Sequence, residues 1–80
     1  MLIQSIKKCL YQVEMTEIEA ETIYQYVLLN DFGIEINEGV NILEKDTLWF
    51  ILCELNRIQF HTNATSNIVN QLKVCLYPLE

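Results

Sequence analysis

Residues 46–61 read DTLWFILCELNRIQFH, and this stretch decides the fold that we expect. Asp46 is a good N-cap residue, because its carboxylate can accept hydrogen bonds from the free amides of a first helical turn. Aliphatic residues then recur at the spacing of one helix face. They are Leu48, Ile51, Leu52, Leu55 and Ile58, with Trp49, Phe50, Cys53 and Phe60 widening the face. The pattern predicts a central helix that is buried on most of its surface.

Helices are also expected on both sides of this segment. The apolar residues of the first 13 positions lie at helical spacing and predict a first helix. A second helix begins at Thr16, where Thr16 and Glu19 match the capping box, and it ends before Gly33, which suits a left-handed position. Because this helix carries apolar residues on two sides, we expect it to pack on both, within the monomer or across a dimer. The polar run 63–66 opens a fourth helix, which Pro78 ends.

Residues 34–43 allow two interpretations. Ile34, Ile36, Val40 and Ile42 alternate with polar residues around a turn that ends in Gly39, which is typical of a β-hairpin. The alternative is a short helix that begins at Asn37. The expected fold class is therefore mainly α: a single domain over residues 1–80 with four helices and a short β-hairpin or irregular insert at 34–43.

Acidic residues are concentrated in one part of the chain. The formal net charge is −6, and residues 9–44 contain eight acidic residues and no lysine or arginine. These are Glu14, Glu17, Glu19, Glu21, Asp31, Glu35, Glu38 and Glu44. Such a segment is either a solvated face that keeps an apolar small protein in solution, or a docking surface for a basic partner. The scattered lysines argue against direct binding of nucleic acid, which depends on clustered cations.

The candidate partner-binding residues combine this acidity with nearby polar and aromatic side chains. They are Glu14, Glu17, Glu21, Tyr24, Gln25, Asp31, Glu35 and Glu38. Carboxylates in a row compete for arginines and lysines that would otherwise hold phosphates. The expected partner is a protein with a basic surface, such as a nucleic-acid-binding enzyme or a toxin. Tyr24 is the expected hot spot, because tyrosine is enriched at interfaces.

The sequence contains no pattern that indicates catalysis, a cofactor or a metal. Cys53 and His61 are too far apart on one helix to hydrogen-bond, and short zinc-ligand spacings are missing. Cys9, Cys53 and Cys75 are expected to be reduced and to pack as small apolar residues, although one pair could form a disulfide. No signal peptide or membrane span is recognisable, so we expect a soluble, cytoplasmic protein that is not an enzyme.

Three functional hypotheses follow. The first is a small acidic protein that blocks or sequesters a partner, of the inhibitor, anti-defence, immunity or antitoxin type. The second is a homo-oligomeric helical scaffold or accessory subunit, with the second helix at the seam of a homodimer. The third is an accessory protein that binds a ligand between its helices.

Overall fold

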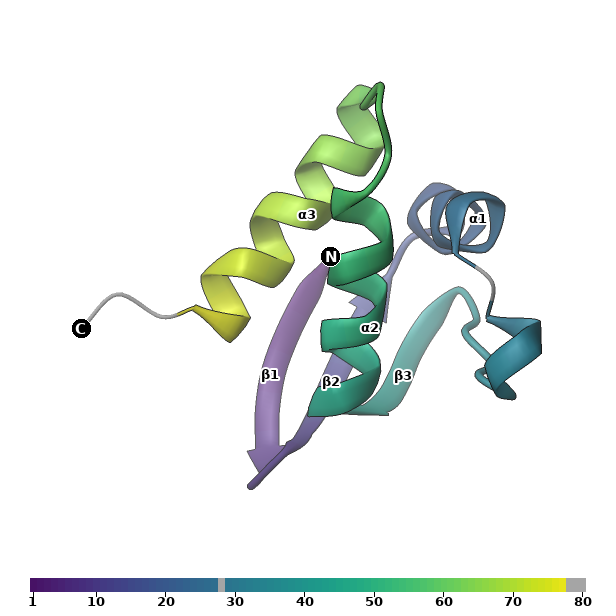
Figure 1. Cartoon of the computed structure of the whole chain (residues 1–80). Coiled ribbons are helices and arrows are strands. Elements are labelled where there is room, and N and C mark those ends of the chain that lie inside the picture. The colour runs from purple at the N-terminus through teal and green to yellow at the C-terminus, as the bar shows by residue number, and fades with distance from the viewer. Residues whose placement is uncertain (28, 78–80) are drawn as a thin grey trace.

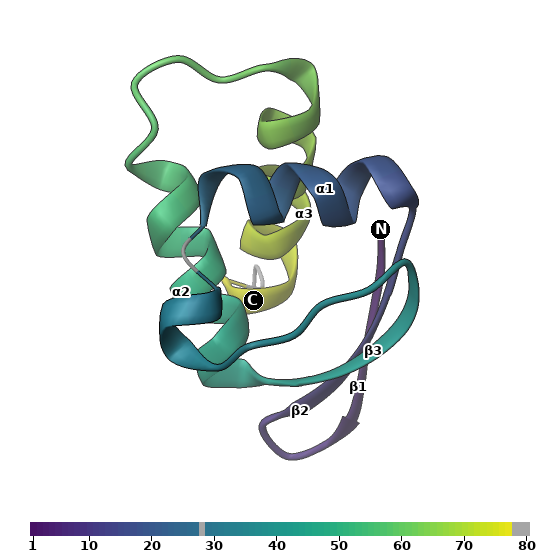
Figure 2. The ribbon, with the colours of Figure 1, turned by 90° about the vertical axis from the view of Figure 1, so that its right-hand side faces the viewer.

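The protein has an α+β fold (Figure 1), which corrects the expectation of a four-helix domain. The computed structural model describes residues 1–27 and 29–77, and the elements below are those of these residues. They are β1 (Leu2–Lys7), β2 (Leu10–Met15), α1 (Glu17–Tyr26), the 3-10 turn η1 (Asn30–Phe32), β3 (Gly39–Glu44), α2 (Lys45–Asn56) and α3 (Asn63–Leu76). The strands form an antiparallel sheet in the order β1-β2-β3, and the helices lie on one side of it (Figure 2).

The expected N-terminal helix is wrong, because this segment is the hairpin of β1 and β2. Its apolar residues fit a helical spacing, but Tyr11, Val13 and Met15 also alternate along β2, and the last two are buried. The turn between the strands contains Cys9, whose φ of 62° is uncommon for a residue with a side chain. A hairpin turn without glycine or asparagine leaves no local signal in the sequence.

The expected hairpin within residues 34–43 does not form. Instead, β3 pairs with β2 from Met15 opposite Gly39 to Leu10 opposite Glu44. The alternating segment is thus a strand, but its partner lies far away in the chain. An alternating strand usually turns its apolar residues towards the core. Here Val40 and Ile42 are instead 57% and 53% exposed, and Asn41 and Leu43 face the core.

The second helix begins where the sequence predicts. The Thr16 hydroxyl accepts from the Glu19 amide at 3.2 Å, and the Thr16 amide donates to the Glu19 carboxylate at 2.9 Å. α1 ends at Tyr26, and Gly33 takes a left-handed φ of 67° after η1 instead of directly after the helix. The helix buries one side only, since Ile18 is 67% exposed. Ile18 on the second apolar side is therefore not packed within the monomer, and the alternative that this side packs across a dimer stays a prediction.

The two later helices are confirmed, with shifted ends. α2 begins at Lys45, one residue before the predicted cap, and ends before His61 is reached. α3 begins with a capping box between Thr62 and Thr65. Pro78, which was expected to end this helix, lies outside the described residues.

The hydrophobic core lies between the helices and the inner face of the sheet, with α2 at its centre. It contains Val13, Met15, Ala20, Ile23, Val27, Leu29, Ile36, Leu43, Leu48, Ile51, Leu52, Leu55, Ile68, Val69, Leu72 and Leu76. Cys9 and Cys53 are exposed, which corrects the expectation that all cysteines pack as apolar residues. Within residues 1–27 and 29–77, no helix has the length and apolarity to cross a membrane.

Candidate protein-binding face

One side of α1 is exposed along its length, and we call its five residues the α1 stripe. They are Glu17, Ile18, Glu21, Tyr24 and Gln25. Their spacing of one, three or four positions places them on one helix face, opposite the buried residues of α1. Two carboxylates, one amide and two large apolar side chains therefore share this surface.

A hydrogen bond attaches the segment after η1 to this stripe. The Ile36 amide donates to the Tyr24 hydroxyl at 2.8 Å. Ile36 is buried, so its side chain anchors the segment in the core while its backbone is held by α1. Glu35, the preceding residue, is exposed. The bond therefore places a further carboxylate beside the aromatic part of the α1 stripe.

The turn that leads into β3 is fixed by one asparagine. The Asn41 carboxamide accepts from the Asn37 amide at 2.9 Å and donates to the Asn37 and Gly39 carbonyl oxygens at 2.8 and 3.3 Å. Asn41 is only 8% exposed, and it lies on the core side of β3. A buried amide that satisfies both backbone groups of one turn residue defines the shape of that turn. Glu38, in the middle of the turn, is thereby presented to solvent.

Carboxylates from three segments surround one depression of about 430 Å³, which we call the acidic hollow. Glu14 comes from the end of β2, Glu17 and Glu19 from the start of α1, and Glu38 from the turn before β3. The segments meet because Met15 pairs with Gly39 where β2 and β3 end together. Negative charge that is dispersed over 25 positions of sequence is thus gathered at one place.

Glu19 has a different role from the other carboxylates of the hollow. Its carboxylate lies 2.8 Å from the Met1 ammonium group and also accepts from the Thr16 amide. Partial burial would raise the pKa of Glu19, but these hydrogen bonds and the positive charge of the ammonium outweigh it and hold the pKa below its ordinary value. Glu19 is therefore occupied within the protein, whereas Glu14, Glu17 and Glu38 are exposed.

We call the α1 stripe, Glu35 and the acidic hollow together the acidic face. All eight residues predicted from the sequence apart from Asp31 lie on it. Asp31 is exposed in η1, but no hydrogen bond or ion pair among the described residues links it to the others. The sequence pattern did not indicate Ile18 as part of this face, because an apolar residue at helical spacing is expected to be packed. Asn41 was missed because its partners are backbone groups, which no sequence pattern reveals.

The described part of the chain offers few groups that could bind a metal or act on a substrate. No group of three histidine, cysteine or acidic residues there has the geometry to hold a metal ion. His61 lies in the loop before α3, where its Nδ1 is 3.2 Å from the Thr65 hydroxyl. Comparisons with known protein families, with curated proteins and with solved structures find no match, so the case for a function rests on geometry and charge.

Proposed function

We propose that the protein binds a basic surface of another protein through the acidic face. The observation that carries this proposal is the convergence of carboxylates from β2, α1 and the turn before β3 around the acidic hollow. Within residues 1–27 and 29–77, the ion pairs join Glu19 to Met1 and Glu54 to Arg57. The exposed carboxylates of the face are thus available to cations of a partner.

The composition of the face suits a protein partner better than free cations. Ile18 and Tyr24 supply apolar surface between the carboxylates, and such side chains can exclude water from neighbouring ion pairs. Arginine fits this combination, because its planar guanidinium pairs with carboxylates in a bidentate manner and stacks on aromatic rings. The proposed partner surface is therefore rich in arginine.

Binding of this kind inhibits any partner that uses the same basic surface to hold phosphates. Carboxylates held in a fixed arrangement compete directly with a nucleic acid for those cations. This supports an inhibitor, antitoxin, immunity or anti-defence role over that of a scaffold with α1 at its seam. A symmetric contact through α1 would place the acidic faces of two copies against each other, and like charges at an interface are unfavourable.

The test is a binding measurement with charge-reversal variants. A partner is first captured from cells of the native host with the tagged full chain, and its dissociation constant is then measured by calorimetry at several salt concentrations. Glu21→Lys with Glu35→Lys should weaken binding by ~100-fold or more, because two attractive contacts become repulsive. Binding of the unaltered protein should also weaken as salt rises, because exposed charges are screened.

The matched control reverses two carboxylates outside the acidic face. Glu44→Lys with Asp46→Lys changes the net charge by the same amount, and both residues are exposed. This control should change the dissociation constant less than ~3-fold, apart from the effect of total charge. Equal losses for both double variants would show that only the net charge matters and would refute the acidic face as the binding site.

A further inference from the structure

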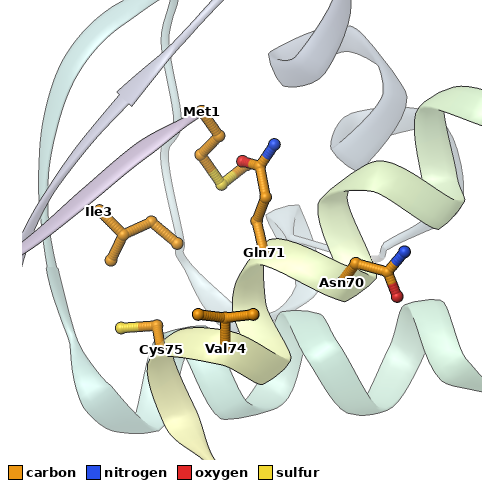
Figure 3. A pocket seen from close by; sticks show the side chains of 6 residues that line it. All are labelled: Met1, Ile3, Asn70, Gln71, Val74 and Cys75. Carbon is orange, nitrogen blue, oxygen red and sulfur yellow. The ribbon is translucent and has the colours of Figure 1, made fainter. Parts of the chain in front are cut away.

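A second surface of the protein is a groove of about 370 Å³ between β1 and α3 (Figure 3). Its lining consists of Met1, Ile3, Asn70, Gln71, Val74 and Cys75. The groove exists because α3 packs mainly on α2 and α1 and stays apart from β1. Figure 1 shows the C-terminal half of α3 reaching past the outer edge of β1. Val74, on this half of the helix, is 75% exposed.

The groove borders polar groups that have no hydrogen-bond partner among the described residues. β1 is at the edge of the sheet, so within the described residues the backbone groups on its outer side have no strand partner. The Gln71 side-chain oxygen is buried beside it and accepts no hydrogen bond from any described residue. An edge strand of this kind can pair with a further strand. An extended polypeptide segment supplies amide donors and carbonyl acceptors to the free edge, and it can supply a donor to the Gln71 oxygen.

The two ends of β1 carry opposite charge. At one end, Lys7 and Lys8 are exposed, and they are the only cationic side chains in residues 1–44. The other end lies at the acidic hollow, where Glu14 and Glu17 are exposed and the Met1 ammonium group is already paired with Glu19. An identical strand placed antiparallel to β1 brings the positive end of each copy to the negative end of the other. A parallel arrangement would place like charges together at both ends.

We propose that the groove and the free edge of β1 bind β1 of a second copy, in antiparallel orientation. A register centred on Gln4 places Leu2 of one copy opposite Ile6 of the other, and both side chains are exposed in the monomer. The same register brings Lys7 and Lys8 towards Glu14 and its neighbours. One sheet then continues through both copies, and Val74 of α3 contacts the added strand on the side that faces the helices.

This proposal is independent of the partner proposed above. The contact leaves Glu21, Tyr24, Gln25 and Glu35 uncovered, so each copy keeps the centre of its acidic face. The two inferences overlap only at Glu14 and Glu17, on the border of the acidic hollow. A monomer could still bind a basic partner, and a dimer could form without one.

A charge-swap experiment tests the orientation directly. Sedimentation equilibrium of the full chain from about 1 to 500 µM at low salt gives the dissociation constant of the dimer. Lys7→Glu with Lys8→Glu, and separately Glu14→Lys with Glu17→Lys, should each raise this constant by ~10-fold or more, because both ends of the contact become repulsive. An equimolar mixture of the two variants should form a heterodimer within ~3-fold of the original affinity, since each end is again complementary.

Two further variants locate the contact. Val74→Glu should weaken the dimer, because the side chain lies at the rim of the groove. Ile42→Glu should leave the dissociation constant unchanged, because this exposed residue is on β3, at the other edge of the sheet. Circular dichroism confirms that each variant is folded.

Three results would overturn the proposal. The first is an unaltered protein that stays monomeric at the highest concentration. The second is a mixture of charge-reversal variants that does not associate. The third is a dimer that Ile42→Glu abolishes, which would place the contact at β3 or on the outer face of the sheet instead of at the β1 edge.

Discussion

Replacing Asn41 by aspartate tests whether one buried amide determines the shape of the turn that carries Glu38. In the native protein the Asn41 side chain accepts one hydrogen bond and donates to the carbonyl oxygens of Asn37 and Gly39, with a longer contact of 3.5 Å to that of Val13. Asn41→Asp keeps the acceptor but loses the two shorter donated bonds and the longer contact. The new carboxylate also faces these three carbonyl oxygens at a site that is 8% exposed.

The expected cost at neutral pH is about 3–4 kcal/mol in the free energy of unfolding. The two lost hydrogen bonds account for about 2 kcal/mol, at roughly 1 kcal/mol each. Burying a charge next to carbonyl oxygens adds about 1–2 kcal/mol after the site relaxes. A loss of this size is large for a protein of 80 residues, whose total stability is about 5–10 kcal/mol.

The dependence on pH distinguishes a buried carboxylate from a simple loss of contacts. Burial and the carbonyl oxygens raise the pKa of the new carboxyl in the folded state above its value of about 3.9 in the unfolded chain. The folded state then binds more protons, so stability is retained below pH ~3.9 and is lost as the pH rises through the folded-state pKa. Asn41→Ala loses the same donated hydrogen bonds, and the accepted one as well, but introduces no titrating group, which makes it the control for the pH dependence.

The assay is urea unfolding of both variants from about pH 3.5 to 7.5, with hydrogen exchange at the Asn37 amide as a local probe. The stability of Asn41→Asp should fall relative to Asn41→Ala across this range, and the Asn37 amide should exchange faster in both. A constant difference between the variants would refute the charge argument. A loss below ~1 kcal/mol at neutral pH would refute the role of Asn41 in the turn.

Three other predictions concern the core, the start of α1 and the cysteines. Leu52→Ala should lower the free energy of unfolding by about 2–5 kcal/mol in urea titrations, because Leu52 is buried in the centre of α2. Because the pKa of Glu19 is lowered in the folded protein, its contribution is present above about pH 4.3 and is lost as the pH falls through the folded-state pKa. Glu19→Gln should therefore cost up to about 1 kcal/mol at pH 7, and this cost should shrink as the pH falls below about 4.3, as measured by the same titrations. In alkylation followed by mass spectrometry, Cys9 and Cys53 should react before Cys75, because burial raises the pKa of the Cys75 thiol even though the charge of a nearby lysine opposes this.

The helices α1 and α2 could be predicted from the sequence, because the signals that specify them lie within a few neighbouring residues. The capping residue Thr16 and the apolar repeat around Leu52 each act within a few positions, and both α1 and α2 form where these signals occur. The sheet depends on information that is not local. Nothing near Val40 indicates that its strand pairs with residues 10–15, and the turn at Cys9 carries no typical turn residue. A helix was therefore predicted where a hairpin forms.

The candidate site was predictable in its charge but not in its geometry. Most acidic residues are exposed in a small protein, so the composition of residues 9–44 was enough to select Glu14 and Glu38. Their proximity depends on the pairing of β2 with β3, which no local sequence signal indicates. The exposure of Ile18 could not be recognised either, because the hydrophobic pattern alone does not tell which of two apolar sides of a helix finds a neighbour.

The pairing of Met15 with Gly39 also bears on how this protein can change over generations. The chain leaves the sheet after Met15 and returns to the same place at Gly39, so residues 16–38 are an excursion that starts and finishes between fixed anchors. Substitutions on the outer side of that excursion leave the strand register as it is. Under the proposed function, the side chains that contact a partner can therefore change, in evolution or by library selection on α1, while the sheet beneath remains the same.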